Sequence, residues 1–190
     1  LDGQPYDEPG YLTDLISSRA AQYVRDRAHA RQPFILSLHY TAPHWPWETR
    51  SQGGIDPEIS RDIAHLDGGN VETYQTMIRE MDEGIGWVVD ALKETGQLED
   101  TVIIFTSDNG GERFSDNWPL VGGKMDLTEG GIRVPYIVHW PQGIQSPGRA
   151  SEQHSLTMDW TATILDIAGV KPPSGHSLDG VSLRLTFDQP

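Results

Sequence analysis

The chain has 190 residues, of which 36% are hydrophobic and 22% are charged, and these values are ordinary for one globular domain. Its net charge of −14 argues against nucleic acids and anionic membranes as partners, because both are bound through basic surfaces. No apolar run reaches the roughly 18–20 residues that cross a bilayer. The lack of cysteine excludes disulfides, thiolate metal sites and a cysteine nucleophile from these residues.

Two long helices are predicted in the first half of the chain. Apolar side chains recur at helical spacing over residues 12–30, and Pro33 ends this helix because a residue before proline avoids the α region. Residues 71–95 carry a continuous apolar stripe, and Gly96 suits the left-handed position that follows a helix. The polar segment 51–70 between them is predicted to be a surface loop, with at most one short helical turn.

Short apolar runs predict three strands, at residues 34–40, 102–105 and 134–140. The run 102–105 has no polar alternation, which is typical of a strand buried on both faces in a parallel sheet. A further helix is predicted over residues 156–168, and the residues after it are loop-like. Alternating helices and strands indicate an α/β layered fold with a mostly parallel central sheet flanked by helices.

Polar side chains follow the second of these strands. Asp108 and Asn109 can offer oxygens to a hard cation. Asn109-Gly110 is also typical of a hairpin turn, but no second strand follows within a hairpin's reach. Lys124 comes 15 residues after Asn109, behind two glycines, and its ammonium could meet an anion held near such a metal.

A histidine follows the first predicted strand. His44 lies on a loop that Pro43 and Pro46 stiffen, and the alternative is a loop histidine that bonds its own backbone. Trp45 and Trp47 either line a pocket for a ring-shaped substrate or cover the core. In α/β sheets the crevice lies beyond the carboxyl ends of the strands, which is where these strands would place Asp108, Asn109 and His44.

Four motifs together resemble the sulfatases of the alkaline phosphatase superfamily, in particular the formylglycine-dependent, arylsulfatase-like group. They are APHWP (42–46), TSDNGG (106–111), GGK (122–124) and EGGIRVP (129–135). The resemblance implies an alkaline phosphatase-like fold and hydrolysis of a sulfate ester, either a sulfated carbohydrate or an aryl sulfate. It also implies an exported protein, whether periplasmic, extracellular or lysosomal.

The same resemblance assigns roles to single residues. Asp108 and Asn109 match two of four side chains that hold Ca²⁺, with Mg²⁺ possible, and the other two belong to an Asp pair near the family's N-terminus. Lys124 and His44 match residues that contact the sulfate. Glu129 and Arg133 are expected to hold their loop rather than to take part in chemistry.

The chain departs from the family pattern at the nucleophile. The formylglycine arises from Cys or Ser in a C/S-x-P-x-R motif, and the one similar segment, residues 145–149, has Gln at the position to be converted. We therefore expect residues 1–172 to be the later portion of a catalytic domain, without its N-terminal half and inactive alone. Residues 173–190 would begin the connection to a C-terminal subdomain.

Two other readings stay open from the sequence. A phosphatase or phosphonate monoester hydrolase of the same superfamily would use Lys and His for phosphate in the same way. A non-catalytic carbohydrate-binding module would use a platform of tryptophans, namely Trp45, Trp47 and Trp118.

Overall fold

The computed structural model describes residues 3–4, 7–30, 32–53 and 68–187. The chain divides into two compact units. Unit 1 comprises Leu1–Leu98 and Ile104–Ile137, and unit 2 comprises Glu99–Ile103 and Val138–Pro190. Among the described residues, no helix is both long and apolar enough to cross a membrane.

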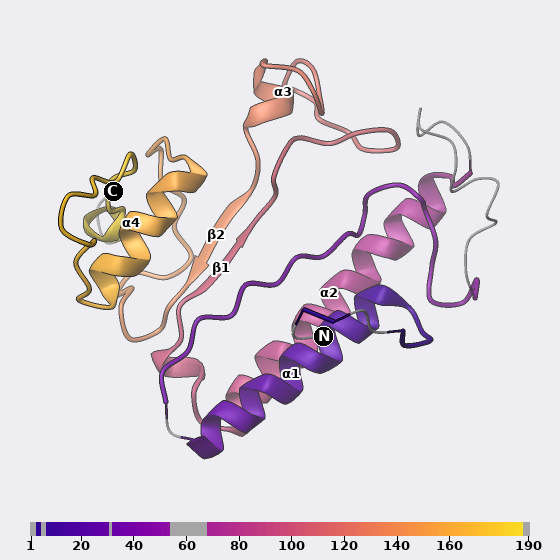
Figure 1. The fold of residues 1–190 in the computed structure, drawn as a ribbon. Coiled ribbons are helices and arrows are strands. Elements are labelled where there is room, and N and C mark those ends of the chain that lie inside the picture. The colour runs from indigo at the N-terminus through magenta and orange to yellow at the C-terminus, as the bar shows by residue number, and fades with distance from the viewer. Residues whose placement is uncertain (1–2, 5–6, 31, 54–67, 188–190) are drawn as a thin grey trace. The chain divides into compact units, whose positions relative to one another are not determined.

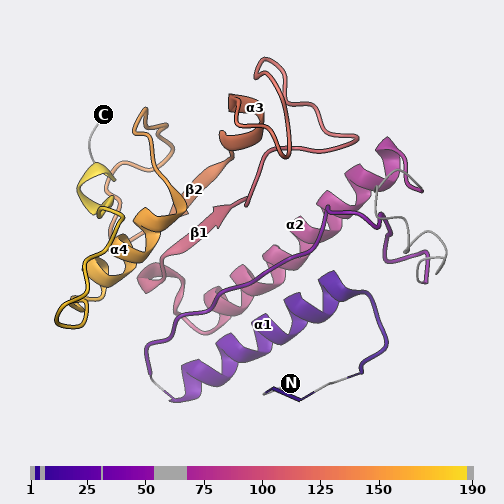
Figure 2. The same cartoon turned by 45° about the horizontal axis from the view of Figure 1, so that its top comes forward.

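Unit 1 is built on two long helices, α1 (Leu12–Ala30) and α2 (Val71–Glu94), which lie side by side (Figures 1 and 2). The Asn70 side chain caps α2 by accepting a hydrogen bond of 2.8 Å from the Thr73 backbone N–H. Gly96, with φ of +70°, follows its end in the left-handed region. Both helix predictions are thus confirmed.

The two helices approach each other closely at Ser17 and Gly84. Ser17 is fully buried, and its hydroxyl donates to the Thr13 carbonyl at 2.6 Å. A Cβ on Gly84 would overlap the Ser17 side chain, so only glycine allows this approach. The Tyr40 hydroxyl lies 3.0 Å from Ser17 Oγ and ties the segment after α1 to the helix pair.

The prediction of a strand over residues 34–40 is wrong, because the structure has no strand there. A strand needs a neighbour about 4.8 Å away, and none of the described residues pairs with this run. Side chains anchor it instead, since Phe34 packs edge-on against Tyr23 of α1. Ile35 on its other side is 75% exposed. Most of the predicted loop 51–70 lies outside the described residues.

The sheet of the described residues has two antiparallel strands, β1 (Ile103–Thr106) and β2 (Tyr136–His139). The mostly parallel central sheet predicted above is therefore not present in this part of the chain. Each strand falls within or beside its predicted run. All four residues of β1 are half-buried rather than fully buried, because only one strand and few side chains cover them. A short helix that was not predicted, α3 (Glu129–Ile132), precedes β2.

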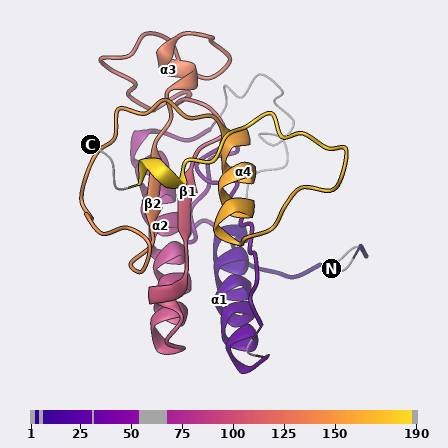
Figure 3. The same cartoon turned by 90° about the vertical axis from the view of Figure 1, so that its left-hand side faces the viewer.

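Unit 2 holds α4 (Thr157–Ile167), which confirms the third predicted helix, and a 3-10 turn, η3 (Arg184–Thr186) (Figure 3). The Asp159 carboxylate accepts hydrogen bonds from the backbone N–H groups of Leu156 and Val181, at 2.8 and 2.9 Å. These bonds lower the pKa of Asp159. The buried Thr163 hydroxyl accepts from the Leu183 N–H at 2.9 Å. Polar groups of α4 thus hold the returning segment 181–183 against the helix.

Candidate functional site

Three glycine-rich segments of unit 1 are joined through their backbones around Lys124. After β1, Gly110 N–H donates to the Gly131 carbonyl of α3 at 2.8 Å. Lys124 N–H donates to the Gly111 carbonyl at 3.0 Å, and Gly130 N–H donates to the Val121 carbonyl at 2.7 Å. The end of β1, the GGK loop and α3 therefore form one hydrogen-bonded assembly that fixes the backbone of Lys124.

This assembly requires glycine at its contacts. A Cβ on Gly110 would overlap the Gly130 carbonyl, and a Cβ on Gly130 would overlap the Gly122 carbonyl. A Cβ on Gly131 would overlap the carbonyls of Gly123 and Asp126. Since backbone atoms cannot move aside as a flexible side chain can, any side chain here would separate the segments.

The Asn117 side chain closes the assembly from the connecting loop. Its Oδ1 accepts from the Gly111 N–H at 3.2 Å, and its Nδ2 donates to the Gly111 and Gly122 carbonyls, each at 3.1 Å. One amide thus satisfies backbone groups on two segments, which a hydrophobic side chain could not do. Nothing in the sequence distinguishes Asn117 from other polar loop residues.

Lys124 and His44 meet although 80 residues separate them in the sequence. Lys124 Nζ lies 2.8 Å from His44 Nε2 and donates to Glu112 Oε2 at 2.9 Å. The Lys124 and Glu112 side chains are 20% and 31% exposed, so this ion pair is partly shielded from water. The structure therefore brings together two of the four predicted site residues and adds Glu112, which the sequence analysis missed.

The contacts of His44 define which ring nitrogen carries the proton. An ammonium group can only donate, so Nε2 accepts from Lys124 through its lone pair. Nδ1 lies 2.5 Å from the Trp45 carbonyl, which can only accept. His44 is accordingly the neutral Nδ1–H tautomer here, and its backbone bond coexists with the contact to Lys124.

The loop that carries His44 is fixed to both long helices by Arg50. Its guanidinium donates to Asp14 of α1 at 2.6 and 2.9 Å and to Glu83 of α2 at 3.0 Å. These hydrogen bonds raise the pKa of Arg50 further above its usual range. The Arg50 backbone N–H also bonds the buried Glu80 carboxylate at 3.1 Å.

Asp108 and Asn109 follow β1 directly and precede the glycines of the assembly. Asp108 is exposed, and within the described ranges no group donates a hydrogen bond to its carboxylate. Its oxygens are therefore available to a cation. No three His, Asp or Glu side chains cluster as a complete metal site in the part of the chain described.

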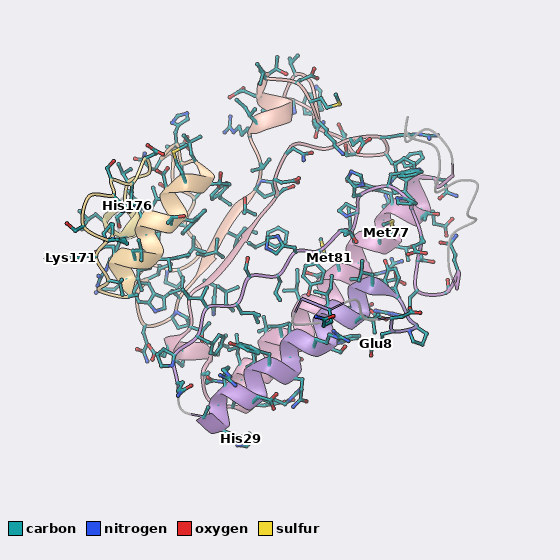
Figure 4. The ribbon with its side chains drawn as sticks, viewed as in Figure 1. Glu8, His29, Met77, Met81, Lys171 and His176 are labelled. Atoms are coloured by element: carbon teal, nitrogen blue, oxygen red, sulfur yellow. The ribbon has the colours of Figure 1, made fainter. Side chains whose placement is uncertain are left out.

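The aromatic residues near His44 belong mainly to the core. Trp47 is 7% exposed and forms a buried cluster with Ala42 and Met77, against which Met81 packs from the same helix (Figure 4). Trp47 thus covers core, the second of its two predicted roles. Tyr74 packs on the same cluster, and burial raises the pKa of its phenol, with a further increase from the Glu112 charge.

The Glu129–Arg133 pair is a weak ion pair. Its atoms are 3.4 Å apart, and its side chains are 65% and 64% exposed, so it adds little to the loop's stability. Backbone bonds of Gly130 and Gly131 hold this region instead.

Comparison with known proteins identifies the family of this chain. The sulfatase family model matches residues 2–170. The chain belongs to the sulfatase family.

Two curated sulfatases and one solved structure show the extent of the similarity. The chain is 34% identical to N-acetylgalactosamine-6-sulfatase of Rattus norvegicus, covering 94% of this chain and 33% of that protein. It is 34% identical to steryl-sulfatase of Mus musculus, covering 92% and 27%. The crystal structure of Ps i-CgsB in complex with k-i-k-neocarrahexaose superposes with a TM-score of 0.83 at 34% identity, covering 98% of this chain and 40% of that one. The chain thus spans about a third of the length of the curated relatives it matches.

Proposed function

We propose that this chain supplies one half of the sulfate-ester site of a sulfuric ester hydrolase, with Lys124 and His44 contacting the sulfate. The contact of 2.8 Å between their side-chain nitrogens carries the proposal, because it joins two motifs of the family at one point. Sulfuryl transfer builds negative charge on oxygens, and fixed donors aimed at those oxygens lower the barrier.

The hydrogen bonds of Lys124 leave room for a sulfate oxygen. An ammonium has three N–H donors, and the described residues provide two acceptors, His44 Nε2 and Glu112 Oε2. The third N–H can bind an oxyanion without breaking either bond. His44 would contact the sulfate as a donor only when Nε2 takes a proton in place of its bond to Lys124. Glu112 then orients Lys124 and offsets part of its charge, so the lysine positions the ester without binding sulfate product too tightly.

The residues after β1 fit a divalent cation. Asp108 and Asn109 offer oxygen ligands, and the exposed Asp108 carboxylate has no donor from the described residues. Oxygen ligands favour Ca²⁺, with Mg²⁺ as the alternative, over softer metals. When bound, the cation would neutralise charge that develops on the sulfate. Because Ca²⁺ takes six to eight oxygens, the other ligands would come from outside this chain's pair.

We further propose that these 190 residues do not turn over a sulfate ester alone. The chain has no cysteine and no serine in a C/S-x-P-x-R motif, so it lacks the formylglycine that the family requires. Residues 1–172 would be the later portion of the catalytic domain, and the missing N-terminal half would supply the nucleophile, the other ligands and the parallel strands. Residues 173–190 would lead to a C-terminal subdomain.

The substrate class proposed is a sulfated carbohydrate. The Ps i-CgsB structure contains a neocarrahexaose, and the relatives include a sulfatase named for N-acetylgalactosamine 6-sulfate. Trp118, which is 84% exposed, offers a ring on which a saccharide could stack in the parent protein. An exported location is proposed on the ground of membership in the sulfatase family.

Binding of a sulfated monosaccharide, followed by ¹H–¹⁵N NMR, tests the proposal. A galactose 6-sulfate should shift the amide signals of the GGK and APHWP segments, and Lys124→Ala should abolish those shifts. Arg79→Ala removes one exposed cation on α2 and serves as the control. The proposal fails if the sulfated and unsulfated sugars give the same shifts. A galactose 6-phosphate that binds tenfold more tightly would favour the phosphatase alternative.

A further inference from the structure

We propose that Arg113 is a specificity-determining residue that binds a second anionic group of the substrate, beside the sulfate held at Lys124. This inference rests on the proposed function of the Lys124–His44 site. It concerns a different side chain, which none of the family motifs contains. The second group would be another sulfate or a carboxylate on the same or the neighbouring sugar.

Arg113 lies over two aromatic rings. Its guanidinium carbon is 4.6 Å from the centre of the Phe114 ring and 5.3 Å from that of Trp47. The two rings pack edge-on, 4.8 Å apart, and Trp47 is buried. The rings therefore form a rigid platform against which the flat face of the guanidinium packs. This packing reduces the conformational entropy that the Arg113 side chain loses when it binds a ligand.

The loop that contains His44 and Trp47 comes together with the segment that contains Glu112 and Arg113 at two places, Lys124 and Arg113. His44 and Trp47 belong to one loop, while Glu112 and Arg113 are neighbours in the other. His44 reaches Lys124, which pairs with Glu112, and Trp47 lies under Arg113. Because the Lys124 partner Glu112 and the stacked Arg113 are consecutive residues, both cations would serve one recognition surface.

The backbone conformation of Phe114 helps to define the arrangement of these side chains. Phe114 has φ of +72°, a left-handed conformation that bulky side chains rarely adopt. This strained turn directs its ring onto Trp47 and beneath Arg113. Strain of this kind persists only where surrounding contacts determine it, and it is common in ligand clamps.

Arg113 has the chemistry for a planar or tetrahedral anion. Its guanidinium packs on the rings while the side chain is exposed, and five N–H donors let it bind an anion in addition to its contacts within the protein. Guanidinium binds carboxylate and sulfate-like groups through paired, charge-assisted hydrogen bonds. In a chain with net charge of −14, a fixed cation beside the site would select a multiply anionic saccharide over a singly sulfated one.

Three probes test the assignment by titration calorimetry on the full chain. They are a monosulfated disaccharide, the same disaccharide with a second sulfate, and the same disaccharide with a carboxylate. Wild type should bind one of the two doubly anionic probes about tenfold more tightly than the monosulfated probe, the effect of one charge-assisted pair. The preferred probe identifies the second group.

Arg113→Met keeps the apolar stem on the rings and removes the charge, so it should bring that affinity ratio close to one. Arg113→Lys should restore part of the ratio, and Arg79→Met, the same charge change on α2, should leave it unchanged. An unchanged ratio in Arg113→Met overturns the role of Arg113 alone. Wild type that binds none of the three probes, or Lys124→Ala that binds all three as wild type does, overturns the proposed function and this inference with it. A thermal unfolding curve for each variant excludes misfolding as the cause.

Discussion

Ser17 Oγ of α1 lies so close to the position that a Cβ on Gly84 of α2 would take that the two atoms would overlap. Gly86, two residues further along α2, has open space within 4 Å of its own Cβ position. The two glycines therefore form a matched pair on one helix, with opposite expected responses to the same substitution.

Gly84→Ala should destabilise the chain by about 1–3 kcal/mol, the usual cost of forcing extra volume into a packed contact. Gly86→Ala should stabilise it by up to about 1 kcal/mol, because alanine favours the helix. Urea unfolding of both variants measures the two free energies. Equal effects of the two substitutions would contradict the close approach of the helices.

The Lys124–His44 contact predicts a neutral His44 with its proton on Nδ1. Long-range ¹H–¹⁵N NMR of the imidazole should show an unprotonated Nε2. Lys124→Met keeps most of the side-chain volume but removes the donor, so it should shift the Nε2 signal. A wild-type spectrum with the proton on Nε2 would contradict the described contact.

Calcium should bind weakly to these residues alone, since Asp108 and Asn109 provide few of the six to eight oxygens that Ca²⁺ takes. Titration calorimetry should give a dissociation constant on the order of 10⁻³ M or weaker, the range of the poorest calcium sites. Asp108→Asn should abolish the heat of calcium binding. Asp126→Asn, at a carboxylate that already accepts a hydrogen bond from the Gly123 N–H, should leave this heat unchanged. Tight binding that survives Asp108→Asn would show that other residues hold the metal.

Asp159 should make the stability of the chain depend on pH. The Leu156 and Val181 N–H groups lower the pKa of Asp159 in the folded state. Its contribution to the free energy of unfolding is therefore full above the unfolded pKa of about 3.9, and it is lost as the pH falls through the lower folded pKa. Asp159→Asn should cost about 1–3 kcal/mol at pH 7, the cost of a poorly satisfied buried group, and less near pH 3. Urea midpoints from pH 7 to 3 measure the difference.

Asp179→Asn makes the same charge change at an exposed carboxylate of unit 2, so it is the matched control for Asp159→Asn. The control should leave the urea midpoint nearly unchanged at every pH. A deficit for Asp159→Asn that grows as the pH falls would contradict the direction given for its pKa.

The purified chain should give no turnover of an aryl sulfate, since it has no cysteine and none of its serines stands in a C/S-x-P-x-R motif. A chromogenic aryl sulfate assay, with and without Ca²⁺, measures this. Turnover that scales with protein and disappears in Lys124→Ala would refute the claim of inactivity.

Local patterns predicted the helices well because helix formation depends on neighbours three and four residues apart. The ranges of α1, α2 and α4 follow from apolar spacing and from end signals such as Gly96. The run 34–40 has the composition of a strand but no partner among the described residues, and a ladder cannot form from one strand. Pairing is a property of two segments, so no single run can reveal it.

The candidate site, like the fold, could be predicted only in part from the sequence. The motifs singled out His44 and Lys124, and the structure brings them into contact, while the roles of all four predicted site residues stay predictions. Glu112 and Asn117 sit in a stretch that looks irregular in the sequence, yet one pairs with Lys124 and the other bonds two loops. Their significance depends on partners that are distant in the chain.

The sequence by itself determined the family, the three main helices and the residue types available for sulfate chemistry, because these depend on order and spacing along the chain. Only the tertiary structure decided that Lys124 lies between His44 and Glu112 and that Arg113 lies on Trp47 and Phe114. The backbone of Lys124 is held where glycine-rich segments with no side chains between them come into direct contact. The contacts of Lys124 with His44 and of Arg113 with Trp47 likewise join segments that are far apart in the sequence, so no local pattern contains them.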